Sequence, residues 1–270
     1  MTWLSFVVAV FPSSPLLVLL LLLSLLASLV SSGLTSDCLR WNCPCTGDTL
    51  RSDGKITIAK RFQLLSRKAQ HTRQKAQFLL NRVQSERFRG NQDHSAALRD
   101  CTDVRDPSCM ETHLAEECLL EGLPIIDHPQ DGATIDGTSQ NADELFKTTR
   151  LQLARIAVFI EQARLDERQH VPDPRHSLHD DLRRLEEEGL YNLLCGLQVN
   201  FSRRQIPWHP PLQRGVMYDK CRLLGNRAAI DNRNYMVLYT LDKLLLKITH
   251  QFRSLANHRA KRPVTTLARY

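Results

Sequence analysis

Apolar residues recur at helical spacing through four long segments of this 270-residue chain, and nowhere do apolar and polar residues alternate for long. Such steps place apolar side chains on one face of a helix. The pattern therefore predicts an all-α fold with helices at about 53–89, 140–168, 174–204 and 229–258. The apolar stripe of the first helix consists of Ile58, Phe62, Leu65, Ala69, Ala76, Leu79 and Val83.

Residues typical of helix starts precede or open three of these segments. They are Ser52-Asp53 for the first helix, the capping-box pair Asn141 and Glu144 for the second, and Asp173-Pro174 for the third. We therefore expect each of these helices to begin at its capping residues.

The lengths of the connections restrict how the helices are arranged. A helix of about 28 residues is about 42 Å long, so returning along it takes at least about a dozen extended residues. The connections 90–139 and 205–228 are long enough for this return, whereas the connection between the second and third helices is too short. The order long, short, long predicts an up-up-down-down four-helix bundle. An ordinary antiparallel bundle with decorated loops is the alternative.

The first 32 residues contain no charged side chain and include an apolar run from Pro15 to Val30. Small residues follow this run, as signal peptidase requires. We therefore predict a signal peptide at 1–32 and a secreted, extracellular protein. An apolar run of this length could also stay in the bilayer as a signal anchor.

Eight cysteines follow the predicted signal peptide, and an oxidising compartment favours disulfides for them over metal or redox sites. A bond from one of the first three to Cys195 would fasten the N-terminal lead to the third helix. A bond such as Cys118–Cys221 would tie the two long connections together. A lone cysteine on an apolar helix face is otherwise just a small buried side chain. The eight are Cys38, Cys43, Cys45, Cys101, Cys109, Cys118, Cys195 and Cys221.

The net charge of +7 is distributed unevenly along the chain. Residues 53–89 hold ten Lys and Arg against two acidic residues, and residues 90–144 hold thirteen Asp and Glu against two arginines. We expect the acidic connection to lie across the basic helix, so that the two screen each other. The alternative is a basic patch for heparan sulfate or an acidic partner.

Three segments of the chain carry a family resemblance: HLAEECLLEGLPIIDHP at 113–129, SLHDDLRRLEEEGLYNLLCGL at 177–197 and VLYTLDKLLLKITHQFR at 237–253. The first two resemble the first-loop segment and the third helix of leukemia inhibitory factor and oncostatin M. The last is similar to the fourth helix of the related ciliary neurotrophic factor group. The resemblance therefore indicates a long-chain helical cytokine of the interleukin-6 class.

This resemblance implies a cytokine domain at 33–258, followed by a basic tail at 259–270 that is similar to the processed tail of oncostatin M. In the relatives, the third-helix cysteine bonds to an N-terminal cysteine, and the first-loop cysteine bonds near the fourth helix. Four cysteines exceed the family pattern, and their pairing stays open: Cys43, Cys45, Cys101 and Cys109.

The family resemblance also implies two receptor surfaces. The first lies on exposed faces of the first and third helices and binds the shared signal-transducing receptor of the interleukin-6 class. Asn192 matches an asparagine of the relatives three residues before the cysteine, and Glu188 and Gly189 lie at or next to their glycine position. The alternative is that Asn192 is an ordinary solvated helix residue.

The second surface lies at the start of the fourth helix, where the family has a phenylalanine and a lysine three residues apart. Met217 and Lys220 keep this chemistry here, with Tyr218 and Trp208 as neighbouring apolar residues. Aligning the body of the helix instead places Ala228 and Asp231 there. The alternative is that these residues merely pack the loop.

We expect a monomeric secreted cytokine that bridges the shared receptor and a second receptor chain of the leukemia inhibitory factor or oncostatin M type, activating JAK/STAT signalling. A secreted helical carrier is the alternative. Asn200 begins the sequon Asn-Phe-Ser, which should be exposed and glycosylated. The basic tail makes heparan sulfate a further candidate partner.

Enzymatic chemistry is not indicated by the sequence. His176 and His179 could supply half of a metal site, but no second half has the required spacing, so we expect neither metal nor cofactor. No nucleophile elbow or phosphate-binding glycine motif is present either. Nucleic-acid binding is disfavoured because the chain is predicted to be secreted and its basic residues lack interleaved aromatic side chains.

Overall fold

The computed structural model describes residues 39–45, 56–104, 107–114, 118, 120–126, 139–171, 173, 175–207 and 211–261. Within these residues the chain forms helices and no strand, as the apolar periodicity predicts. The predicted signal peptide, the cap at Ser52-Asp53 and the tail from residue 262 onward lie outside the described residues. No helix among the described residues combines the length and the apolar character that crossing a membrane requires.

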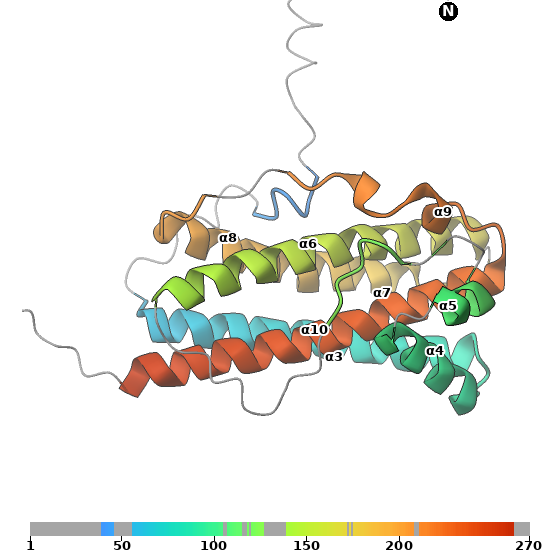
Figure 1. Ribbon diagram of the computed structural model, residues 1–270, viewed down its shortest axis with the longest axis horizontal. Helices are drawn as coiled ribbons and strands as arrows, with labels where there is room; N and C mark the ends of the chain where they lie inside the picture. Colours follow the sequence, from blue (N-terminus) through green and yellow to red (C-terminus); the bar gives the residue numbers. More distant parts are fainter. Residues whose placement is uncertain are drawn as a thin grey trace, which may run out of the picture. The chain divides into compact units, whose positions relative to one another are not determined.

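Four long helical segments pack together, and each corresponds to one of the predicted helices (Figure 1). The third segment consists of three consecutive pieces, α7, the π-helix η1 and α8, which we call the third helix. The segments are α3 (Ile58–Glu86), α6 (Ser139–His170), the third helix as α7 (His179–Arg184), η1 (Leu185–Tyr191) and α8 (Asn192–Arg203), and α10 (Arg227–Lys261).

The first of these, α3, begins where Thr57 caps it: the Thr57 side chain accepts a hydrogen bond from the Lys60 backbone N–H at 3.3 Å. The predicted apolar stripe is buried along the helix, apart from its first member. Ile58, the first residue of the helix, is 48% exposed.

The third helix begins later than predicted, at His179. The carboxylate of Asp173 accepts the Arg175 backbone N–H at 3.0 Å and so caps a turn instead of a helix. The next turn is held by the buried carboxylate of Glu167, which accepts the Leu178 N–H at 2.9 Å. The expected start at Asp173-Pro174 is therefore wrong. The Glu167 carboxylate of α6 takes the Leu178 N–H, so the helix begins only after this residue.

The contacts between helices give the helix directions. Where two helices are antiparallel, residues later in one helix contact residues earlier in the other. By this criterion α3 and α6 run in one direction, and the third helix and α10 run in the other (Figure 1). The defining contacts are Ser66 with Thr249, Arg73 with Asp242, Lys68 with Asn192, Arg82 with Asp181, Phe146 with Phe201, Arg164 with Glu186, Phe146 with Phe252, and Glu167 with Arg227.

An aromatic cluster fills the core at the end where α3 begins and α10 ends. Each long helical segment contributes one buried phenylalanine to it: Phe62, Phe146, Phe201 and Phe252. Neighbouring ring centroids lie 5.4 to 6.1 Å apart. Such aromatic pairs contribute about 0.5–1.5 kcal/mol each beyond the burial of their area, so this cluster stabilises the contact of all four segments.

The opposite end of the bundle is held by a buried carboxylate. Glu167 of α6 is 1% exposed and accepts hydrogen bonds from Arg87 at 2.9 Å and from Arg227 at 2.8 Å. With the bond from Leu178, this one side chain connects the end of α3, the start of the third helix and the start of α10 to α6. A buried carboxylate is stable only when it is paired in this way.

The first long connection contains two helices that the apolar pattern did not predict, α4 (Gln92–Val104) and α5 (Pro107–His113). α4 packs against α10, where the Asp103 carboxylate accepts from Lys243 at 2.6 Å. The expectation that this connection lies across the first helix is therefore wrong for its described residues. The helix α4 buries Leu98 completely, and apolar burial against the bundle outweighs exposed charge attraction.

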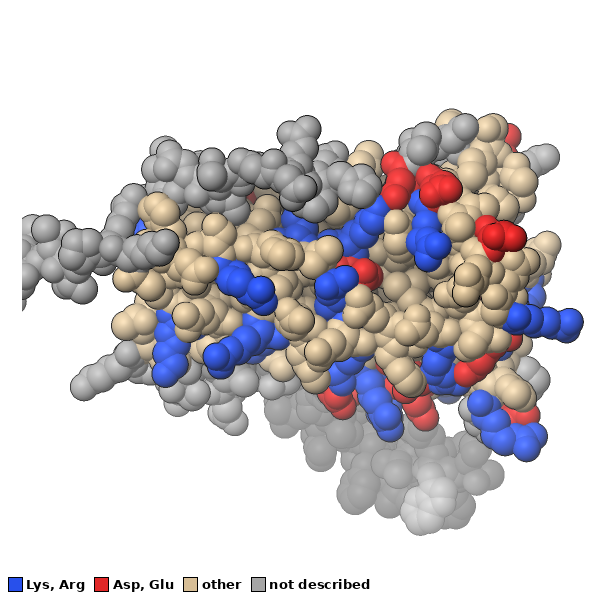
Figure 2. All heavy atoms as spheres, turned by 90° about the horizontal axis from the view of Figure 1, so that it is seen from below, with Lys and Arg blue, Asp and Glu red and all other residues tan. Residues whose placement is uncertain are grey.

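Three basic side chains of α3 and its C-cap residue Arg87 pair with carboxylates on the other long helices. The ion pairs are Arg73 with Asp242 at 2.8 Å, Lys75 with Glu188 at 2.5 Å, Arg82 with Asp181 at 2.5 Å, and Arg87 with Glu167 at 2.9 Å. On the face drawn in Figure 2, Lys and Arg occur along the whole length, whereas Asp and Glu are missing toward the end where α3 begins and lie in the middle and toward the other end. Charge is therefore balanced along only part of this face.

Disulfides fasten the N-terminal lead to the third helix and join the two long connections to each other. The Cys118–Cys221 bond was anticipated from the sequence, and so was a bond from the N-terminal lead to Cys195; the partner of Cys195 is Cys45, which the family resemblance had counted as an extra cysteine. A further bond joins α4 to α5. The bonds are Cys45–Cys195, Cys118–Cys221 and Cys101–Cys109, with Cα atoms 4.8, 4.7 and 5.6 Å apart. Cys43 is also disulfide-bonded, and Cys38 lies outside the described residues.

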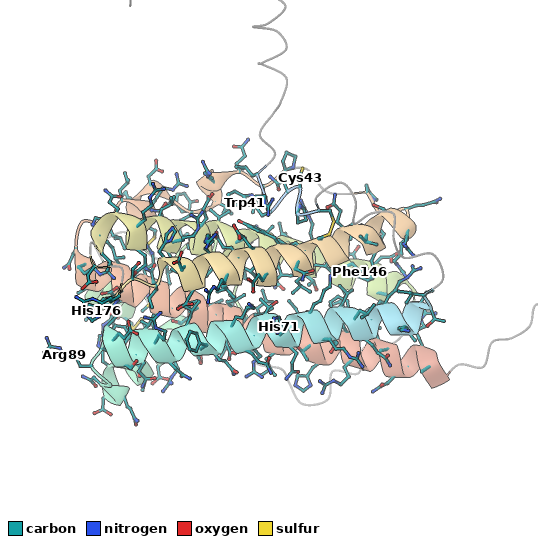
Figure 3. All side chains as sticks on the ribbon, turned by 180° about the vertical axis from the view of Figure 1, so that it is seen from behind. Trp41, Cys43, His71, Arg89, Phe146 and His176 are labelled. Carbon is teal, nitrogen blue, oxygen red and sulfur yellow. A yellow bond between two sulfur atoms is a disulfide. The ribbon has the colours of Figure 1, made fainter. Side chains whose placement is uncertain are left out.

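The lead before α3 is anchored by Trp41, which is 1% exposed (Figure 3). Its indole N–H donates to the Leu212 carbonyl at 3.1 Å, and the Asn42 amide donates to the same carbonyl at 2.9 Å. The Leu212 N–H in turn donates to Asn42 at 2.9 Å. The lead therefore docks on the second long connection, which carries the 3-10 helix η2 (Arg214–Val216) and α9 (Asp219–Arg222).

Candidate functional site

Two of the predicted receptor residues on the third helix lie beside α3 and bond to it. The Lys68 ammonium donates to the Asn192 side-chain oxygen at 2.7 Å, and Lys75 pairs with Glu188 at 2.5 Å. Both Asn192 and Glu188 are exposed, so their outer edges remain accessible to a partner. The Lys75 ammonium holds the pKa of the Glu188 carboxyl below its usual value, because it bonds to the ionised form.

Gly189, the third predicted residue of this surface, is buried and faces α3. A Cβ atom at this position would lie 2.9 Å from the Thr72 methyl carbon, closer than side chains approach each other. Gly189 therefore allows η1 and α3 to pack closely and offers no side chain to a partner. The structure places Glu188 and Asn192 on the accessible surface and Gly189 beneath it.

Phe78 is a member of this surface that the sequence analysis missed. It lies on α3 one turn from Lys75 and is 55% exposed, and it is the one exposed phenylalanine among those the structure describes. A signal was present in the sequence, because Phe78 falls outside the apolar stripe that predicted the helix. We call Lys68, Lys75, Phe78, Glu188 and Asn192 the Phe78 surface; Figure 3 views the molecule from the side where α3 and the third helix lie in front.

The inner side of the same π-helix carries a second carboxylate. Glu186 is 2% exposed, pairs with Arg164 of α6 and lies 3.5 Å from the Tyr191 hydroxyl. Burial raises the pKa of Glu186 to about 7, although Arg164 acts in the opposite direction. Burial also raises the pKa of Tyr191, so its hydroxyl stays protonated at neutral pH.

The second predicted surface separates into buried and exposed residues. Met217 is completely buried and therefore packs the second long connection. For this residue the alternative, packing of the loop, is the one that holds. Tyr218 is 54% exposed and Lys220 is exposed beside it. In the other alignment, Ala228 is exposed and Asp231 pairs with Arg227 at 2.6 Å. Trp208 lies outside the described residues.

The predicted glycosylation site is not exposed in the folded chain. Asn200 is 8% exposed, and its side-chain nitrogen donates to the Gly196 carbonyl at 2.7 Å. This nitrogen is the atom that would carry a glycan. The expectation of an exposed sequon is therefore wrong, because Asn200 lies on the inner side of α8, where it completes a bond to the preceding turn.

The two histidines considered as metal ligands lie near the start of the third helix. His176 is exposed, and the His179 ring nitrogen lies 3.3 Å from the Asp180 carboxylate. Across the described part of the chain, no three or more His, Cys, Asp or Glu side chains are grouped so that they could hold a metal ion.

Comparison of the chain with protein-family models, with curated proteins and with solved structures found no match.

Proposed function

We propose that this chain is a secreted long-chain helical cytokine that signals by bringing two receptor chains together. The observation that carries the proposal is the Phe78 surface, which combines an exposed aromatic side chain of α3 with two polar contacts between α3 and the third helix. It lies on the two helices where the family resemblance expects the shared receptor of the interleukin-6 class. The protein acts as a monomer and contributes binding energy, with no reaction of its own.

The helix order supports the proposal. Two parallel helices followed by two that run in the opposite direction correspond to the up-up-down-down arrangement of long-chain cytokines. Both long connections are held by disulfides, which are typical of proteins from oxidising compartments.

Phe78 has the features of an interface hot spot. A rigid aromatic ring that enters a partner's pocket loses little conformational entropy, and a few such residues carry most of the free energy of binding. The surrounding charges on Lys75 and Glu188 lie at the rim, where they set orientation and association rate more than affinity.

The second receptor, of the leukemia inhibitory factor or oncostatin M type, is proposed to bind at Tyr218 and Lys220. Tyr218 supplies an exposed aromatic ring beside a cation, which is the chemistry expected there. A receptor at each surface brings two intracellular kinases together and activates JAK/STAT signalling. Met217 is left out of this surface because it is buried.

A carrier function would require an apolar cavity between the helices. The aromatic cluster instead fills the core, with Phe146 lying 5.4 Å from Phe252 and 5.8 Å from Phe62 between ring centroids. We therefore do not carry this alternative forward.

The test is binding of the oxidised, secreted chain to the extracellular domain of the shared interleukin-6-class receptor. Phe78→Ala should weaken binding about 30-fold or more, because loss of a hot spot costs at least about 2 kcal/mol. Asn192→Arg should also weaken it, by placing a bulky cation at the rim. Surface plasmon resonance measures both dissociation constants.

Leu165→Ala is the matched control, because Leu165 is also a large exposed apolar side chain, 40% exposed, on α6. It should leave the dissociation constant unchanged. Lack of saturable binding at micromolar concentration by a folded, fully oxidised sample would refute the proposal. Equal weakening by Leu165→Ala and Phe78→Ala would remove the Phe78 surface from it.

A further inference from the structure

Two adjoining hollows form a groove between α3 and the last turns of α10. The first has a volume of about 480 Å³, the second about 410 Å³, and they share Arg253 and Asn257. The remaining lining residues are Gln63, Ser66, Arg67, Gln70, His71 and Gln74 of α3 and His250, Ser254 and His258 of α10. No lining residue of the two hollows is a carboxylate or a large apolar side chain.

The groove is basic because both of its walls lack acidic residues in sequence. No Asp or Glu occurs between residues 54 and 85 or between residues 243 and 270. The antiparallel packing of α3 on α10 brings these two stretches side by side, as the bond from Ser66 to the Thr249 carbonyl at 3.0 Å shows. On α10, the last carboxylate before this stretch is Asp242, which is paired with Arg73.

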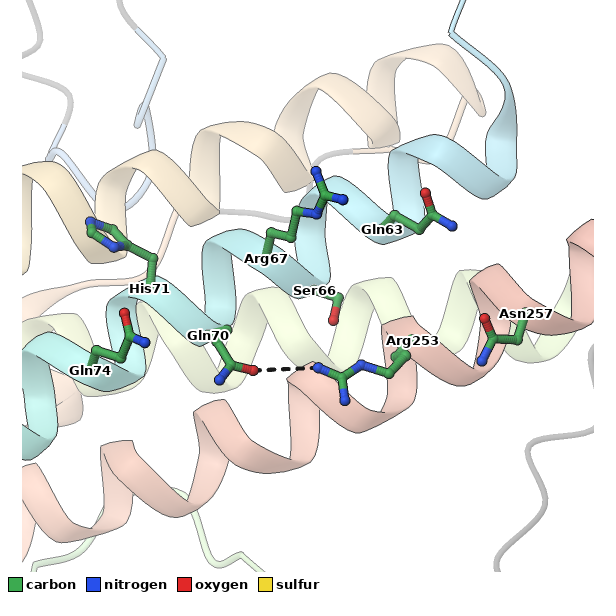
Figure 4. Close-up of a pocket in the computed structure, with 8 residues that line it drawn as sticks. All are labelled: Gln63, Ser66, Arg67, Gln70, His71, Gln74, Arg253 and Asn257. Carbon is green, nitrogen blue, oxygen red and sulfur yellow. Dashed lines mark hydrogen bonds between the residues drawn. The ribbon is translucent and has the colours of Figure 1, made fainter.

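The basic side chains point where an external anion can reach them. Arg67, His71 and Arg253 are exposed, and Figure 4 shows Gln70 and Arg253 facing one another across the groove. The Arg253 guanidinium donates to the Gln70 side chain at 3.4 Å, a long bond that leaves its other N–H groups available. Figure 2 shows the same end of the face rich in Lys and Arg.

We propose that this groove binds a sulfated polysaccharide of the heparan sulfate type. Guanidinium groups bind sulfate through two parallel hydrogen bonds, and the amides of Gln63, Gln70 and Asn257 can bond to sugar hydroxyls. The α3 wall from Gln63 to Gln74 is about 17 Å long. A site of this length can contact several consecutive sugar units of a polysaccharide.

Two other kinds of anionic partner, a membrane and a nucleic acid, fit this groove less well. An anionic membrane would be held by apolar side chains inserted beside the cations, and the groove supplies none. Nucleic acid is disfavoured by the disulfides, which are typical of extracellular proteins. The inference goes beyond the proposed receptor function and does not depend on it, because polysaccharide binding is measured with the chain alone.

The test is binding of the full oxidised chain to immobilised heparin at physiological salt. The double variant Arg67→Gln, Arg253→Gln should bind about tenfold more weakly and with a shallower salt dependence, because two ionic contacts are lost. The matched control is Arg175→Gln, Arg183→Gln, which removes the same charge from exposed arginines near the start of the third helix. This control should retain the affinity and salt dependence of the wild type.

Several results would overturn the proposal. The first is that the wild type does not bind heparin, and the second is that both double variants lose the same affinity. The third is that the wild type binds chemically desulfated heparin as tightly as heparin. The fourth is that the groove variant weakens binding to phosphatidylserine vesicles as much as it weakens binding to heparin. Loss of binding on changing Arg262 and Arg269 to Gln, with the groove variant unaffected, would assign the activity to the tail instead. Circular dichroism of each variant excludes unfolding as the cause.

Discussion

Two carboxylates of the π-helix, two positions apart in sequence, have opposite environments. Glu186 is 2% exposed and paired with Arg164, whereas the side chain of Glu188 is 60% exposed and paired with Lys75. The wider turn of a π-helix changes which side of the segment each residue occupies, and such turns are frequent at functional sites. One short segment thus presents a carboxylate to the proposed receptor and buries another in the core.

The buried Glu186 makes stability depend on pH. Its pKa is about 7 in the folded chain, above the ordinary value of 4.5. As pH rises from 4.5 to 7, the unfolded chain loses this proton before the folded chain does, so the free energy of unfolding falls. Glu186→Gln cannot ionise and should therefore gain stability relative to the wild type across this window, by up to about 3 kcal/mol.

Urea unfolding of the wild type and Glu186→Gln at about pH 5 and about pH 8, on either side of the folded pKa, measures this difference. Glu187→Gln is the control, because Glu187 is the exposed neighbour. Its difference in unfolding free energy from the wild type should be the same at both pH values. A flat difference for Glu186→Gln as well would show that Arg164 keeps the carboxyl ionised in the folded chain.

At the scale of elements, the disulfides differ in how much chain they constrain. Cys45–Cys195 spans a sequence separation of 150, whereas Cys101–Cys109 spans 8 within the first connection. The entropy lost by the unfolded chain grows with the length of the closed loop, so the long bond should stabilise by about 2.5 kcal/mol more.

Replacing both cysteines of a pair by serine tests this ranking. Cys45→Ser, Cys195→Ser should lower the melting temperature about 5–10 °C further than Cys101→Ser, Cys109→Ser, given about 2–4 °C per kcal/mol for a chain of this length. Thermal unfolding followed by circular dichroism gives both values. Equal decreases would mean that the long bond acts through local packing and not through loop closure.

At the scale of the whole molecule, Glu167 connects all four long helical segments at one end of the bundle. Glu167→Ala should lower the free energy of unfolding by about 3 kcal/mol, because it removes one ionic hydrogen bond from each of two partly buried arginines and leaves the buried Leu178 N–H unpaired. A lower urea midpoint with an unchanged slope would establish a loss of stability without a change in the unfolded state.

Glu161→Ala is the control on the same helix. Glu161 pairs with Arg214, whose side chain is 55% exposed, so this change should cost less than about 1 kcal/mol. Comparable losses for the two variants would contradict the role assigned to Glu167.

Local pattern was sufficient for the four long helices and the stripe of α3, because a step of about 3.6 residues is a property of neighbouring residues. It also anticipated the Cys118–Cys221 bond, and it limited the partner of Cys195 to one of three N-terminal cysteines. The candidate site was predicted in part: Glu188 and Asn192 border α3, but Phe78 was missed.

The remaining features depend on which elements become neighbours. Met217 and Asn200 are buried, and α4 packs on α10 instead of α3, because nonlocal surfaces decide burial and outweigh exposed charge. The basic groove exists only because two acid-free stretches far apart in sequence lie antiparallel. The sequence by itself determined the helices and their apolar faces; the tertiary structure decided which polar faces meet, since that contact is absent from either helix alone.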